Sequence, residues 1–83
     1  EVTVARGDEP IVERLGFERN GRSHRHNMWE HCRIVDGSGI IVVGEERVAV
    51  QAGDTCQIPP HTDHWMEPHG WMEIVLMYTH PTN

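Results

Sequence analysis

Short runs of β-type residues, separated by glycine, proline and aspartate, divide this chain from one end to the other. Within the runs, apolar and polar residues alternate or β-branched residues cluster, which is typical of strands with buried faces. No stretch carries an apolar stripe at helical spacing over three turns. The sequence therefore predicts an all-β fold, a sandwich or barrel, with turns at residues 36–39 and 68–70 among others. The predicted strands are 1–6, 11–19, 23–35, 40–43, 47–50, 55–58, 64–67 and 71–78.

The length of the chain limits how it can be stabilised. Its 83 residues leave room for one domain, which we expect to span residues 1–83. A domain of this size buries only about 60% of its unfolded surface. We therefore expect a bound metal ion or a partner subunit to add stability.

Charge and composition exclude several classes of function. The formal net charge is -6, and no basic stripe is present that could bind a nucleic acid backbone. All seven basic residues are arginine, which excludes a lysine nucleophile or Schiff base. No apolar run approaches the ~20 residues of a membrane helix. Cys32 and Cys56 lie in separate predicted strands, so we expect two reduced, inward-facing thiols in a cytoplasmic protein.

Seven histidines in so short a chain indicate metal or proton chemistry. His24 and His26 are two residues apart, so on a strand their imidazoles would share one face, and Glu30 has the same parity. Imidazoles combined with a carboxylate suit a divalent ion of iron, manganese, zinc, nickel or cobalt. A fourth ligand must come from elsewhere, and His64, just after a Pro-Pro turn, is the best candidate.

This stretch resembles the first motif of the cupin superfamily, H-x-H-x(3)-E-x(6)-G, at every step of its spacing. The matching residues are His24, His26, Glu30 and Gly37. A later stretch resembles the second cupin motif, G-x(5)-P-x-G-x(2)-H. Its matching residues are Gly53, Pro59 and His64. The chain is thus similar to small single-domain cupins of the cupin-2 type, over roughly residues 21–78.

Two positions depart from the motifs. His61 replaces the glycine of the second motif, where a permissive backbone is often needed. Glu18 stands where the first motif begins with glycine, so we expect a reshaped entry to the metal-binding strand. Neither position is an expected ligand.

The resemblance implies a double-stranded β-helix, that is, a jelly-roll or cupin β-barrel, with a metal ion near one mouth. It implies His24, His26, Glu30 and His64 as ligands, with two neighbouring coordination positions open to water, dioxygen or a chelating substrate. It also implies a homodimer, which a chain this short has reason to form.

Two functions are compatible with these residues. In the first, the protein is an enzyme of the oxygenase, isomerase or epimerase, cyclase or lyase type, acting on a small molecule with a metal as Lewis acid or oxygen-activating centre. Tyr78 and His61 are then the candidate catalytic residues beside the metal ligands. In the second, the barrel is a non-catalytic module that binds a metal or a sugar. Neither function involves nucleic acid or a membrane.

Overall fold

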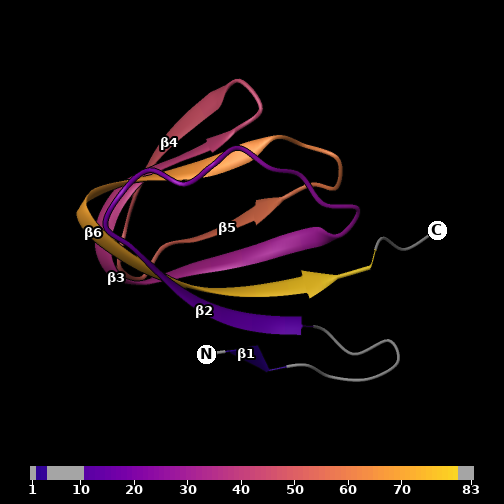
Figure 1. Cartoon of the computed structure of the whole chain (residues 1–83), viewed down its shortest axis with the longest axis horizontal. Coiled ribbons are helices and arrows are strands. Elements are labelled where there is room, and N and C mark those ends of the chain that lie inside the picture. Colours follow the sequence, from indigo (N-terminus) through magenta and orange to yellow (C-terminus); the bar gives the residue numbers. More distant parts are fainter. Residues whose placement is uncertain (1, 4–10, 81–83) are drawn as a thin grey trace.

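The computed structural model describes residues 2–3 and 11–80, and this part of the chain is built from strands (Figure 1). It includes no helix long and apolar enough to cross a membrane. The strands are β1 (Val2–Thr3), β2 (Ile11–Phe17), β3 (Trp29–Val43), β4 (Glu46–Gln51), β5 (Thr55–Ile58) and β6 (His64–Thr79). The all-β prediction is confirmed.

The two long strands, β3 and β6, form an antiparallel ribbon that is folded over on itself, as Figure 1 shows at the bend on its left side. In one layer, the first half of β3 and the second half of β6 pair with each other and are flanked by β5 and β2. In the other layer, the second half of β3 lies between the first half of β6 and β4. The fold is therefore a double-stranded β-helix, as predicted.

The predicted turns at residues 36–39 and 68–70 are wrong, because both segments lie inside continuous strands. They are the corner at which the ribbon passes from one layer to the other, and the pairing register shifts between Gly37 and Gly39. Gly37 has φ +77, and a Cβ there would overlap the carbonyl oxygen of Trp71. A Cβ on Gly39 would lie 2.5 Å from the carbonyl oxygen of Glu67. The glycines thus permit a bend with two backbones in close contact.

Other boundaries follow the sequence more closely. The predicted 55–58 strand is β5, and the predicted hairpin of 40–43 with 47–50 is formed by β3 and β4. The strand predicted over 23–35 begins only at Trp29, because residues 25–28 adopt no regular structure. Of the strand predicted over 1–6, β1 is described, and residues 4–6 lie outside the described part.

The core fills the space between the two layers with the inward side chains of β3 and β6. Alternation along each strand places every second residue inside. Apolar residues of β2 pack against this core from the edge. The buried core residues are Cys32, Ile34, Ile41, Val50, Met66, Met72, Ile74, Leu76 and Tyr78.

The corner gives a stability prediction. Gly37→Ala should lower the free energy of unfolding by about 3 kcal/mol, since the new methyl group adds a backbone clash to the cost of a positive φ. Gly53→Ala is the matched control, because Gly53 has φ +98 but no atom lies within 4 Å of the point that its Cβ would occupy. Gly53→Ala should lower the free energy of unfolding by only about 1 kcal/mol. Urea unfolding of both variants measures the difference, and equal losses would contradict the role of the corner.

Candidate metal centre

Four side chains from three segments meet at one mouth of the barrel. His24 and His26 lie in the segment before β3, Glu30 at the start of β3, and His64 at the start of β6. One ligand atom from each residue lies within 4.8 Å of those of the others. The structure therefore brings together all four residues that the sequence indicated.

A backbone pairing places His24 beside His64, although 40 positions separate them. The amide of His24 donates to the carbonyl of His64 at 3.1 Å, and the amide of His64 donates back at 3.0 Å. Residues paired directly across an antiparallel bridge project their side chains to the same face. As a result, the two ring centroids are 4.2 Å apart.

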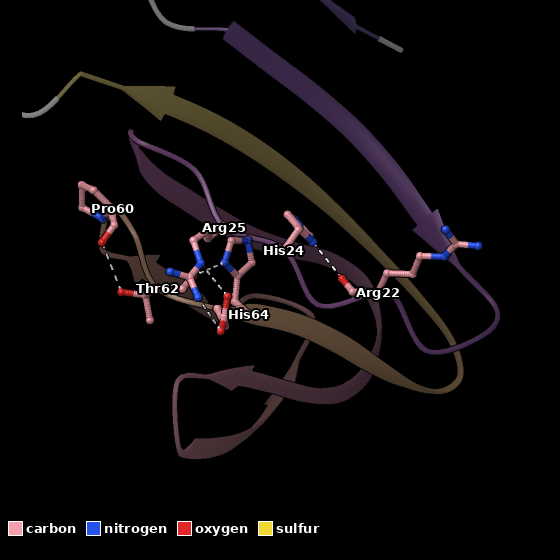
Figure 2. A network of polar contacts seen from close by, with 7 residues as sticks. Arg22, His24, Arg25, Pro60, Thr62 and His64 are labelled. Carbon is pink, nitrogen blue, oxygen red and sulfur yellow. Dashed lines mark hydrogen bonds and ion pairs between the residues drawn. The ribbon is translucent and has the colours of Figure 1, made fainter.

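Backbone carbonyls fix the orientation of two of the imidazoles (Figure 2). Nδ1 of His24 lies 2.8 Å from the carbonyl oxygen of Arg22, and Nδ1 of His64 lies 2.9 Å from that of Thr62. A carbonyl can only accept, so Nδ1–H is the donor, and in the neutral ring Nε2 keeps its lone pair. Metal-binding histidines are commonly oriented in this way by a hydrogen bond from the second ring nitrogen.

Three polar atoms at the centre of the cluster are buried and lack a hydrogen-bond partner: Nε2 of His26, Nε2 of His64 and Oε1 of Glu30. Oε1 of Glu30 lies 3.5 Å from Nε2 of His26 and 3.2 Å from Nε2 of His64. Burying polar groups without partners is costly, so such a group of atoms needs an explanation. A divalent cation explains it, because it would be bound by all three atoms at once.

Burial and charge set the protonation of these groups. Burial lowers the pKa of His26, although Glu30 opposes this effect, so the ring is neutral at pH 7. Burial also acts to lower the pKa of His64, but the Glu30 carboxylate and the Thr62 carbonyl outweigh it and raise the pKa. Burial raises the pKa of Tyr78, and the charges of Glu30 and Glu13 add to this shift. The Tyr78 hydroxyl therefore keeps its proton and can donate a hydrogen bond.

A cavity of about 270 Å³ adjoins the cluster. Most of its wall is apolar, and Glu13 and Tyr78 add a carboxylate and a hydroxyl. The Tyr78 ring meets that of His26 edge to face, with centroids 5.0 Å apart. The sequence indicated Tyr78 but gave no reason to choose Glu13. Glu13 lines the cavity because β2 pairs with β6, which turns Glu13, Leu15 and Phe17 inward.

His61 contributes through its backbone. Its side chain is exposed and does not line the cavity, but its amide donates to the carbonyl of His26 at 2.6 Å. It adopts φ +60, the conformation for which the glycine of the second motif is suited. The His61 imidazole, which the sequence indicated as a catalytic candidate, is thus exposed and outside the cavity wall.

An ion pair joins the two loops that carry the histidines. Arg25 lies between His24 and His26, and its guanidinium donates two hydrogen bonds to the carboxylate of Asp63, at 2.8 and 2.9 Å. Asp63 directly precedes His64 in the chain. Paired N–H···O contacts of this kind fix geometry as well as distance.

His31 lies on the other face of β3 from Glu30, as strand alternation predicts. Its Nε2 lies 3.0 Å from the hydroxyl of Thr79 on β6. Because its imidazole lies outside the cluster, His31 can serve as the control for substitutions of the clustered histidines.

The cupin domain family matches residues 14–78, which include all four clustered residues. The chain belongs to the cupin family. A search of curated proteins found no match.

Several solved structures share its fold. An RmlC-like cupin from Shewanella frigidimarina is 20% identical and superposes with a TM-score of 0.80, over 92% of this chain and 70% of that one. A conserved Streptococcus pyogenes protein of unknown function is 17% identical, with a TM-score of 0.85 over 99% and 73% of the two chains. A predicted oxalate decarboxylase from Thermotoga maritima is 21% identical, with a TM-score of 0.78 over 86% and 66%.

The left-handed backbone at position 61 of this cupin gives a second stability prediction. His61→Gly should be more stable than His61→Ala by about 1 kcal/mol, because glycine adopts a positive φ without steric cost. Both substitutions remove the same imidazole, so the comparison isolates the effect of the backbone conformation on stability. Thermal unfolding measures it, and an alanine variant at least as stable as the glycine variant would contradict it.

Proposed function

We propose that this cupin binds one divalent metal ion through His24, His26, Glu30 and His64 and acts on a small molecule held in the adjoining cavity. The observation that carries the proposal is the set of three buried atoms without partners, two imidazole nitrogens and one carboxylate oxygen. The Nδ1 hydrogen bonds of His24 and His64 support it, since they leave Nε2 free to bind.

The donor set indicates which ions fit. Three imidazoles and one carboxylate suit zinc, iron, manganese, nickel or cobalt. Such an ion, when bound, supplies a Lewis acid for a substrate oxygen or, for iron, a centre for dioxygen chemistry.

The protein's own side chains would position the substrate and exclude water from the cavity. The apolar residues of the cavity, among them Leu15, Phe17 and Ile74, would hold the body of a small substrate and keep water away. Tyr78 would donate a hydrogen bond to a substrate oxygen, and Glu13 would accept one. This arrangement suits an oxygenase, an isomerase or epimerase, a cyclase or a lyase.

Removing two proposed ligands tests the metal site. His24→Ala/His26→Ala should lower the affinity for zinc by more than about 100-fold, since the loss of an outer hydrogen-bonding partner alone costs about 10–100-fold. His31→Ala is the matched control and should keep one ion per chain. Equilibrium dialysis with metal analysis measures both variants. One ion per chain in the double variant, or its loss in the control, would overturn the proposal.

Activity decides between an enzyme and a binding module. The iron-loaded protein should consume dioxygen with at least one of a set of diketones, keto acids and catechols. Tyr78→Phe should then lower kcat by about 10-fold or more while retaining the metal, because only a hydroxyl is lost. Absence of turnover with any metal, together with a thermal shift produced by a sugar or an acid, would instead indicate the non-catalytic module.

A further inference from the structure

The two cysteines lie opposite each other across neighbouring strands. Cys32 of β3 pairs with Cys56 of β5 in antiparallel register, with Glu30 opposite Ile58 two residues away. Directly opposed residues in such a pair have Cα atoms about 4.5–5.5 Å apart, inside the range of about 4.4–6.8 Å that a disulfide requires. No backbone movement is needed to bring the two residues into range.

The two cysteines share the inner face of the barrel. Cys32 belongs to the buried core, and Cys56 packs against that core. Both thiols are free. The pair is therefore a preformed dithiol.

Only one of the two thiols is open to a reagent in solution. Cys32 is 2% exposed. Cys56 is half-buried and lines a cavity of about 530 Å³ between β4 and β5, with Val48, Val50 and Pro59 among its neighbours. A small oxidant can enter this cavity and meet Cys56 first.

We propose that Cys32 and Cys56 are a reversible redox site that a hydroperoxide converts to a cross-strand disulfide. The Cys56 sulfur attacks the peroxide O–O bond and becomes a sulfenic acid, and with hydrogen peroxide the other oxygen leaves as water. The Cys32 sulfur then attacks the sulfenic sulfur, and a second water leaves. Overall, two thiols and one hydrogen peroxide give one disulfide and two waters.

The disulfide would fix a strand that carries part of the candidate metal centre. Within the described residues, β5 pairs with β3 alone, over four residue pairs. It leads directly into the loop that supplies the His61 amide and His64. Oxidation would therefore fix β5 beside Glu30. Where disulfides occur in cytosolic proteins, they are usually transient and serve catalysis or redox sensing.

The test exposes the purified full chain, equilibrated with zinc because that ion has no redox chemistry of its own, to hydrogen peroxide. Intact mass should fall by two hydrogen atoms, and both cysteines should become resistant to alkylation after denaturation. Dithiothreitol should reverse both changes. The Tm should rise by roughly 10 °C, because the bridge closes a long loop of chain.

Single variants separate the two thiols. Cys32→Ser should accumulate a sulfenic acid on Cys56 that dimedone traps, and Cys56→Ser should stay reduced because Cys32 is shielded. Cys32→Ala replaces Cys32→Ser if the buried hydroxyl unfolds the chain. An unchanged intact mass, a disulfide between two chains, or oxidation of the thiols to sulfinic acid would each overturn the proposal. The outcome is independent of the metal proposal, since the same measurements apply to the chain without zinc.

Discussion

The folding over of the β3–β6 ribbon is the constraint on which the rest of the structure depends. His64 pairs with Val43, at the opposite end of β3 from Glu30. On a straight strand these ends would be about 40 Å apart. The corner at Gly37 and Gly39 returns one end over the other, so that Nε2 of His64 comes within 3.2 Å of the Glu30 carboxylate. The same corner encloses the core, so the core and the candidate site depend on one bend.

Sequence reasoning identified the four clustered residues, but strand parity was only part of the reason. Parity holds for His24 and His26, which share a face while Arg25 between them points to Asp63. Strand parity cannot be counted on from His26 to Glu30, because residues 25–28 are irregular and no continuous strand joins the two. The spacing of the two cupin motifs already contains this irregular stretch, which is why the motifs pointed to Glu30 and His64, both of which lie in the cluster.

What the sequence could not show is set by pairing between distant residues. Gly37 and Gly39 are typical of a turn, and only their close approach to the backbone of Trp71 and Glu67 reveals that they permit a bend within a strand. Cys32 and Cys56 read as members of separate strands, and their opposition follows from a register that no local pattern encodes. Glu13 likewise joins the cavity through the pairing of β2 with β6.

The two halves of the candidate metal-binding set are attached to the barrel with different strength. Glu30 and His64 belong to strands that pair along most of their length, whereas His24 and His26 lie on a connecting segment. That segment is joined to the barrel by the backbone bonds of His24, His26 and Gly21 and by the fork of Arg25. Local opening of this connection costs far less than unfolding the barrel. If the cluster binds an ion as proposed, binding would be thermodynamically linked to the closing of this segment, and its local opening would give the ion a route in and out.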